Sequence, residues 1–372
     1  AGSQNALTAA LFGQTSIADA RQAFDALSGE VYGSVQNTQA DETQFARNAI
    51  LGRLRQSDSG GATAALASGG PELGYAESTH SSIGFPGFAR AAADTWHDVT
   101  TWVEGLGGFG HVDADANGNA AALRNFSGLL LGTDARFGAM RVGLVGGYTA
   151  TNLNLDARTS TAGIDSALLG AYAGTSYGSF HLRSGAVASF DSIDTSRLIA
   201  FPGFADAAKA HLNGYTGQAF GEAGYGLSFG RIAVEPFAGL AYVRVHDAAF
   251  AESGGIAALS GSGSNENIGY TSLGLRAGTL WMLANGTVLN PHAALTWQHA
   301  FGDVTPTAAL AFQSSGAAFS VAGVPIATNS ALVEGGIDWR ITARIKLGLE
   351  YQGELAQHAQ VHTAKGNFTW TF

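Results

Sequence analysis

The sequence has no cysteine and only two methionines, and Asp, Glu, Lys and Arg together make up only 13% of its 372 residues. The absence of cysteine excludes disulfides, thiolate nucleophiles and Cys-ligated metals. No run of 18 apolar residues occurs, so a bundle of membrane-spanning helices is excluded as well. The net charge of −10, with no basic stripe, argues against nucleic acid as a partner.

Glycine, by contrast, is abundant: the chain contains 52 glycines, about twice the usual share. The mean hydropathy of +0.09 is too apolar for a disordered chain, and it is spread evenly along the sequence. A transmembrane β-barrel gives such a profile, because its lipid-facing and lumen-facing residues cancel in any sliding window. The composition therefore favours a barrel over a helical membrane protein.

The last residues of the chain carry the clearest period-two pattern. Phe368, Trp370 and Phe372 share one face of a strand, and the Asn and Thr residues between them share the other. Such a strand fits between lipid and a wet lumen. An aromatic C-terminal residue on a strand of this kind is what the outer-membrane assembly machinery of bacteria reads, so we interpret these three aromatics as an assembly signal.

The same alternation predicts twelve strands after Trp96. The expected strands are 98–112, 124–136, 139–153, 162–176, 179–193, 213–228, 231–246, 267–282, 287–302, 329–341, 344–356 and 360–372. Two of them, 98–112 and 231–246, alternate less clearly, which a bulge that shifts the phase would explain. The predicted fold class is an all-β membrane barrel of twelve antiparallel strands, formed by residues 96–372.

The connections between these strands support a barrel over a soluble sandwich. Short connections at 137–138, 177–178, 229–230, 283–286 and 342–343 alternate with longer ones at 113–123, 154–161, 194–212, 247–266 and 303–328, and only 357–359 is short out of turn. One rim of an outer-membrane barrel carries short periplasmic turns and the other carries longer outer loops. A soluble core could not hold Arg344, Lys346 and Glu350 on one inner face.

The pattern of residues 1–57 predicts helices instead of strands. Ser16 is a good N-cap and Gly29 a stop signal for a first helix, and a second helix is expected to begin near Asp41. Arg53 and Arg55 lie in the last turn of the second helix, where they complement the helix dipole. Residues 58–95 are rich in Gly, Ala and Ser and are interpreted as a linker. Residues 1–30 show no signal peptide, so we expect the sequence to be a C-terminal part of a longer exported chain.

Several short motifs could indicate chemistry but fit turns, loops or, at 105–110, a barrel strand better. Gly-x-Ser-x-Gly occurs at 174–178 and at 226–230, both at expected hairpins, and Gly-x-Gly-x-x-Gly at 105–110 is not followed by a helix. Asp113, Asp115 and Asn117 resemble the start of an EF-hand loop, but Arg124 occupies the position of the last ligand. The ten histidines lack metal-ligand spacing. We therefore predict no catalytic, cofactor-binding or metal-binding residue and no enzyme activity in this chain.

A set of longer stretches carries a family resemblance. These are 26–32 (ALSGEVY), 128–134 (GLLLGTD), 221–225 (GEAGY), 234–243 (VEPFAGLAYV), 273–276 (LGLR), 297–299 (WQH), 332–338 (LVEGGID) and the terminal Phe372. In this order they resemble the translocator (β) domain of monomeric autotransporters, the type V secretion systems of Gram-negative bacteria. The resemblance implies an outer-membrane barrel that anchors and supports export of an N-terminal passenger, with the linker helix threaded through its lumen.

The resemblance also implies which residues and partners matter. Arg47, Arg53 and Arg55 of the plug helix are expected to face charged residues of the lumen, although they could instead meet water at a helix end. The expected lumenal charges are Glu222, Glu235, Arg276, Glu334, Asp338 and Glu350. Some relatives cleave the linker at an Asn, but Asn37 and Asn48 are not part of an Asn-Asn pair, so no cleavage site is assigned. The implied partners are outer-membrane lipid and lipopolysaccharide, the barrel assembly machinery, periplasmic chaperones and the chain's own passenger, with the barrel itself a monomer.

Two other functions remain open from the sequence. The barrel could be a passive outer-membrane pore in which residues 1–57 do not fill the lumen, or it could anchor a surface enzyme or adhesin. A plugged barrel passes little current and an open pore passes much, so the conductance distinguishes the first alternative.

Overall fold

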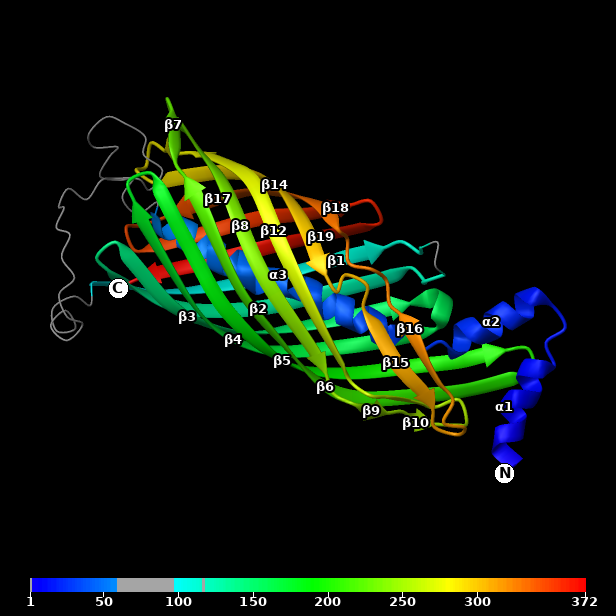
Figure 1. Cartoon of the computed structure of the whole chain (residues 1–372). Coiled ribbons are helices and arrows are strands. Elements are labelled where there is room, and N and C mark those ends of the chain that lie inside the picture. The colour runs from blue at the N-terminus through cyan, green and yellow to red at the C-terminus, as the bar shows by residue number, and fades with distance from the viewer. Residues whose placement is uncertain (1, 59–96, 116–117) are drawn as a thin grey trace.

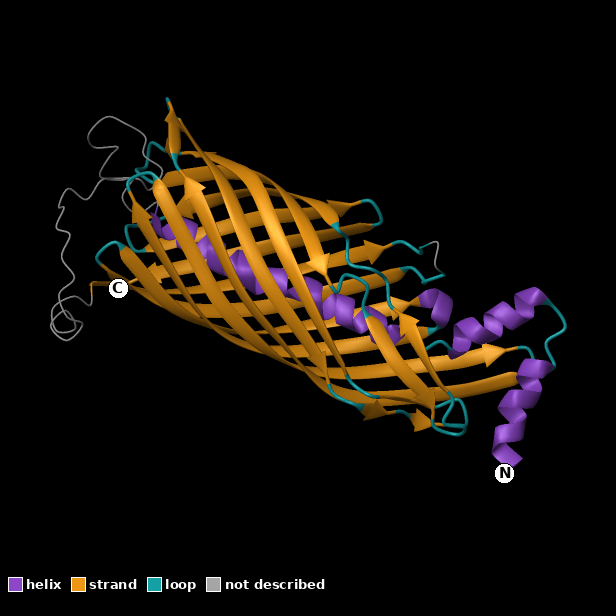
Figure 2. Ribbon diagram, viewed as in Figure 1, coloured by secondary structure: helices purple, strands orange, loops and turns teal. Residues whose placement is uncertain are grey.

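The computed structural model describes residues 2–58, 97–115 and 118–372. A large antiparallel sheet closes into a barrel, and helix α3 (Val31–Asp58) runs along its interior (Figures 1 and 2). Helices α1 (Gly2–Phe12) and α2 (Ile17–Leu27) lie outside one end, beside the long hairpins of the barrel. Among the described residues, no helix is long and apolar enough to cross a membrane.

Twelve strands form the barrel wall, each antiparallel to its neighbours. They are β1 (His97–Val112), β2 (Ala122–Phe137), β3 (Met140–Leu155), β4 (Ser160–Tyr177), β5 (Phe180–Phe201), β6 (Phe204–Tyr225), β8 (Ile232–Asp247), β12 (Ser264–Thr279), β14 (Val288–Gly302), β17 (Asn329–Arg340), β18 (Ile345–Ala356) and β19 (Ala359–Thr371). Pairing of β1 with β19 and of β6 with β8 closes the sheet. The predicted fold of a twelve-stranded antiparallel barrel is confirmed.

The strands alternate between an exposed outer face and a buried inner face. In β14, Leu295, Trp297 and Phe301 lie outside, whereas Thr296 and Gln298 are buried on the inside. Because alternate residues point to opposite faces, one strand can present apolar side chains to lipid and polar side chains to the lumen. The predicted bulge occurs at the start of β1, but β8 pairs without a break from Ile232 to Asp247. The expectation of a shifted phase in 231–246 was therefore wrong, because inward apolar residues such as Val243 only obscured the alternation.

The longer connections contain more regular structure than the sequence predicted. Residues 194–212 were expected to form a loop, but β5 and β6 continue through most of them and meet at Gly203, whose φ is +82°. The connections 247–266 and 303–328 contain β9 (Phe250–Ala251), β10 (Ser253–Gly254), β11 (Leu259–Gly261), β15 (Thr307–Phe312) and β16 (Ala318–Ala322). Four of these form a small separate sheet in the order β16-β15-β11-β9. Smaller elements are the 3₁₀ turn η2 (Asp156–Arg158) and the rim strands β7 (Leu227–Phe229) and β13 (Trp281–Met282).

Helix α2 begins after Ser16, whose hydroxyl accepts a hydrogen bond from the backbone N–H of Asp19 at 3.1 Å. Gly29, with a φ of +67°, separates α2 from α3. Helix α3 begins at Val31, about ten residues before the expected start near Asp41, and its 28 residues span about 42 Å. The sequence did not predict this start, because the first part of α3 contains polar residues such as Gln36 and Asn37 and shows no apolar stripe at helical spacing. In the structure, Gln36 instead donates to Ser264 of β12, and Asn37 donates to the backbone carbonyl of Val324 in the connection between β16 and β17. Most of the predicted linker 58–95 lies outside the described residues.

Candidate functional site

The candidate site is the contact between α3 and the inner wall of the barrel. One face of the helix is apolar, and its residues Phe45, Ala49, Ile50 and Leu54 are buried. They belong to a cluster with Trp102, Leu106, Phe126, Leu130, Val145, Tyr172, Val187 and Phe220 of the wall. The rings of Phe45 and Phe126 stack with centroids 4.4 Å apart. This half of the lumen is therefore filled largely by packed apolar side chains.

Arg53 attaches the C-terminal part of α3 to the wall. Its guanidinium donates two hydrogen bonds to Asp134, from Nε to Oδ2 at 2.7 Å and from Nη2 to Oδ1 at 2.9 Å. Arg141 also pairs with Asp134, and the Tyr172 hydroxyl donates to it at 2.8 Å. The Arg53 and Asp134 side chains are only 4% and 0% exposed, so this bidentate pair is shielded from water.

Two glycines shape the wall beside this pair. A Cβ atom on Gly132 would lie 2.3 Å from the Trp102 ring, and one on Gly143 would lie 2.4 Å from the Tyr172 ring. The rings therefore lie flat over neighbouring strands, where any larger residue would displace them. The indole N–H of Trp102 donates to the Tyr172 hydroxyl at 2.7 Å, which orients that hydroxyl toward Asp134.

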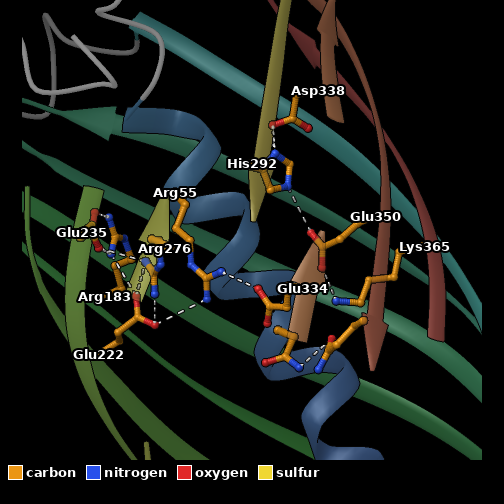
Figure 3. Close-up of polar contacts among 12 residues, drawn as sticks. Arg55, Arg183, Glu222, Glu235, Arg276, His292, Glu334, Asp338, Glu350 and Lys365 are labelled. Atoms are coloured by element: carbon orange, nitrogen blue, oxygen red, sulfur yellow. Dashed lines mark hydrogen bonds and ion pairs between the residues drawn. The ribbon is translucent and has the colours of Figure 1, made fainter. Parts of the chain in front are cut away.

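Arg55 points into the other, charged half of the lumen (Figure 3). Its Nη2 lies 3.5 Å from Glu222 Oε2, and its Nη1 lies 3.5 Å from Glu334 Oε2. These longer pairs, on a side chain that is 23% exposed, are weaker than the Arg53 pair.

Glu222 and Glu235 are held on the wall by two further arginines (Figure 3). Arg183 donates to Glu222 at 3.0 Å and to Glu235 at 2.7 Å. Arg276 donates to the same two carboxylates at 2.7 Å and 3.0 Å, and its guanidinium lies 3.8 Å from the ring centroid of Phe237. The wall therefore already supplies basic partners for both of these carboxylates, and Arg55 of the helix adds a further ion pair to this network.

Asp338 and Glu350 lie on either side of His292 (Figure 3). The nitrogen–oxygen distances from the imidazole are 3.9 Å to Asp338 and 3.8 Å to Glu350, and Lys365 Nζ lies 2.8 Å from Glu350. A cavity of about 120 Å³ separates this group from the helix at Gly52. The charged half of the lumen therefore keeps some open volume.

Arg47 has different partners from those expected. Its Nη1 donates to Gln218 at 3.2 Å, and its guanidinium lies 5.3 Å from the ring centroid of Tyr270. Nearly two turns earlier in the helix, Asp41 accepts from Arg124 of the wall at 2.7 Å. Of the three arginines, Arg55 contacts carboxylates named from the sequence, Arg53 contacts Asp134, and Arg47 contacts an amide and a ring.

The N-terminal end of α3 is held by a separate cluster of buried polar side chains. The Tyr32 hydroxyl donates to Glu252 at 2.7 Å, and Arg197 Nη1 donates to both oxygens of Glu252 at 2.8 and 2.9 Å. Burial and the neighbouring Glu252 carboxylate raise the pKa of the Tyr32 hydroxyl. Glu30, just before the helix, accepts from the Ala120 N–H at 2.6 Å and from Arg158 at 2.7 Å.

The residues that the sequence missed, above all Asp134, Arg183 and Arg197, are charged residues on the inner face of strands. Inward charge in a membrane strand is itself a signal of function, and it could have identified them. Phe368, Trp370 and Phe372 lie on the outer face, 40%, 45% and 59% exposed. Their placement fits a lipid-facing aromatic girdle.

Of the motifs set aside in the sequence, Gly-x-Gly-x-x-Gly at 105–110 lies within β1, and the others lie in hairpins and loops. Ser176 of the first Gly-x-Ser-x-Gly pairs across the β4–β5 hairpin with His181, whose Nδ1 lies 2.9 Å from the hydroxyl. A strand follows this motif, whereas a nucleophile elbow leads into a helix. Asp115 accepts two hydrogen bonds from Asn119 at 2.9 Å, and Asn117 lies outside the described residues.

Comparison with known proteins identifies the family. Residues 101–352 match the family described as the autotransporter beta-domain. Two proteins of Serratia marcescens, each named "Extracellular serine protease", are 32% identical to this chain over 363 residues. Each match covers 97% of this chain and 32% of the relative, so the chain spans about a third of the length of these relatives.

Two solved structures share the fold. The translocator domain of the autotransporter NalP from Neisseria meningitidis has a TM-score of 0.59 at 15% identity, covering 90% of this chain and 99% of that one. The transport unit of AIDA-I from Escherichia coli has a TM-score of 0.56 at 16% identity, covering 77% and 94%. The chain therefore belongs to the autotransporter beta-domain family and is a translocator in the outer membrane of a Gram-negative bacterium, where it supports export of a passenger.

Proposed function

We propose that α3 is a plug that stays in the barrel and tethers the exported passenger to the outer membrane. The observation that carries this proposal is the attachment of one 28-residue helix to the wall along its whole length. Tyr32 holds its N-terminal end, Arg53 and Arg55 hold its C-terminal end, and an apolar face packs against the wall between them. Buried charges that are paired and hydrogen-bonded are costly to separate, so the helix resists withdrawal.

The proposed division of the chain follows from this role. Residues 1–57 form the helical linker and plug, 58–95 form a linker between plug and barrel, and 96–372 form the barrel. The name of the Serratia relatives makes a serine protease the best candidate for the passenger. The translocator itself contributes no catalysis and works by anchoring and by positioning the linker.

The outer surface of the barrel has features that fit the assembly machinery and membrane lipid as partners. Phe368, Trp370 and Phe372 form the assembly signal that the barrel assembly machinery reads, after periplasmic chaperones have delivered the chain. The exposed aromatic and aliphatic residues face lipid, and lipopolysaccharide covers the outer leaflet. A closed barrel has no free sheet edge to pair with another copy, which supports a monomer.

Single-channel conductance in planar bilayers tests the plug. The refolded chain is compared with a variant that lacks residues 1–56 and with a matched control that lacks only residues 1–28, so that α1 and α2 are lost but α3 remains. We expect small currents from the full chain and the control, and a many-fold larger current without residues 1–56. Large currents from all three would favour a passive pore, and equal small currents would show that something other than α3 closes the barrel.

A further inference from the structure

A small cavity lies beside the middle of α3, apart from the ion-pair network of Figure 3. Its volume is about 30 Å³, and it lies between the helix and strands β3 to β6. Its polar lining includes Gln39 and Glu42 of α3 and Asp191 and Thr216 of the wall. A cavity of this size holds about two water-sized particles.

The cavity is lined by hydrogen-bond acceptors that lack donors. Within the described ranges, Gln39 Oε1 and Asp191 Oδ1 are buried atoms without a hydrogen-bond partner. Gln39 is 2% exposed and Asp191 is 4% exposed, so bulk water does not reach them. A buried acceptor needs a donor or a cation, because its desolvation is otherwise uncompensated.

A glycine orients the Gln39 amide. Gly214 pairs in register with Asp191 on one side and with Asp247 on the other. A Cβ atom on Gly214 would lie 2.6 Å from Asp247 Oδ1 and 3.0 Å from Gln39 Nε2, so only glycine leaves room for the amide. Gln39 Nε2 donates to Asp191 Oδ2 at 3.0 Å, which leaves the amide oxygen free to line the cavity.

The charges that line the cavity do not balance. Among the described residues, Glu42 and Asp191 contribute two carboxylates to the lining, and no basic side chain lines it. Uncompensated negative charge away from bulk water is strongly unfavourable, so protons or a cation must neutralise part of it.

We propose that this cavity binds a hard cation of the calcium type, held by the carboxylates of Glu42 and Asp191 and by the amide oxygen of Gln39. Carboxylate and amide oxygens are the ligands that calcium prefers, and it tolerates irregular geometry and retained water. In the part of the chain that the structure describes, no three acidic or histidine side chains form a ready metal cage. The two carboxylates therefore need the amide, neighbouring hydroxyls and water to complete the coordination.

Such a site would join the plug to the barrel. Gln39 and Glu42 belong to α3, whereas Asp191 belongs to β5. The ion would replace repulsion between two carboxylates with a shared attraction and would hold the middle of the helix. The sequence did not predict a metal site, because Gln39 and Asp191 are 152 positions apart and form no linear motif.

Calcium binding to the refolded full chain, measured by equilibrium dialysis after chelation, tests the proposal. We expect one calcium ion per chain, with binding weakened at least tenfold in Glu42→Gln and in Asp191→Asn. The matched control is Asp113→Asn with Asp115→Asn, which removes the carboxylates of the EF-hand-like loop and should leave binding unchanged. Magnesium and sodium are titrated as competitors to establish the class of ion.

Two results would overturn the proposal: no calcium bound to the unmodified chain, or binding that is lost in the loop control but kept in Asp191→Asn. If a variant fails to fold, heat denaturation of the unmodified chain decides the matter. A ligand that binds only the folded state raises the unfolding temperature. Calcium should therefore raise it relative to chelator, and equal temperatures would mean that protons neutralise the site.

Discussion

Replacing Arg53 with alanine should release the plug more than any other single change in α3. The side chain makes two hydrogen bonds of 2.7 and 2.9 Å to Asp134, and both partners are almost fully buried. Removing Arg53 leaves the Asp134 carboxylate in a dry environment with Arg141 and Tyr172 as its remaining partners. The perturbation therefore removes the strongest helix–wall pair without removing every partner of Asp134.

The expected cost can be estimated from similar pairs. Breaking a buried ion pair by removing one partner costs about 3–5 kcal/mol. Because Asp134 keeps two partners, we expect the lower end of this range, about 3 kcal/mol, which corresponds to roughly a 100-fold change in the docking equilibrium of α3. Arg55→Ala is the matched control. Its pairs are 3.5 Å long and its side chain is 23% exposed, so about 0.5–1 kcal/mol is expected.

The assay is the frequency of large-conductance openings in planar bilayers. Openings should become roughly 100-fold more frequent in Arg53→Ala and only a few-fold more frequent in Arg55→Ala. A double-mutant cycle with Asp134→Ala isolates the pair itself, because the effect of Arg53→Ala should shrink once Asp134 is absent. Equal opening frequencies in Arg53→Ala and the unmodified chain would refute the reasoning, as would a larger effect from Arg55→Ala.

Three further outcomes are expected. Gly132→Leu should destabilise the barrel by about 1–3 kcal/mol in urea unfolding, because a Cβ there lies 2.3 Å from the Trp102 ring, whereas Gly105→Ala, which meets open space, should be near neutral. Leu295→Arg, midway along β14 on the lipid face, should cost about 2–4 kcal/mol in lipid vesicles, and a cost near zero would place this face away from lipid. Deleting Phe372 should lower the amount of folded barrel in the outer membrane of cells without changing refolding in detergent; a defect in both would indicate a structural role for Phe372 instead of an assembly signal.

The barrel was predictable because lipid and strand geometry impose a strict local rule. Every membrane strand must alternate in a period of two, so runs such as Leu295 to Phe301 reveal both the strand and its outer face. Turn glycines mark the short rim in the same local way. The N-cap at Ser16 and the break at Gly29 were likewise local signals. For these features, neighbouring residues alone carry the information.

The contacts inside the lumen were decided by the tertiary structure. Whether Arg53 meets Asp134, or Arg47 meets Gln218, depends on the stagger of the strands and the depth of the helix, and residues far apart in sequence set both. The start of α3 at Val31 depends on the wall as well, since polar residues such as Gln36 find partners there that they would lack in an isolated helix. The sequence by itself thus determined the barrel and its lipid face, because period and turn chemistry are local. Only the closed barrel decided how the plug is held, because pairing across a lumen requires the whole wall to be in place.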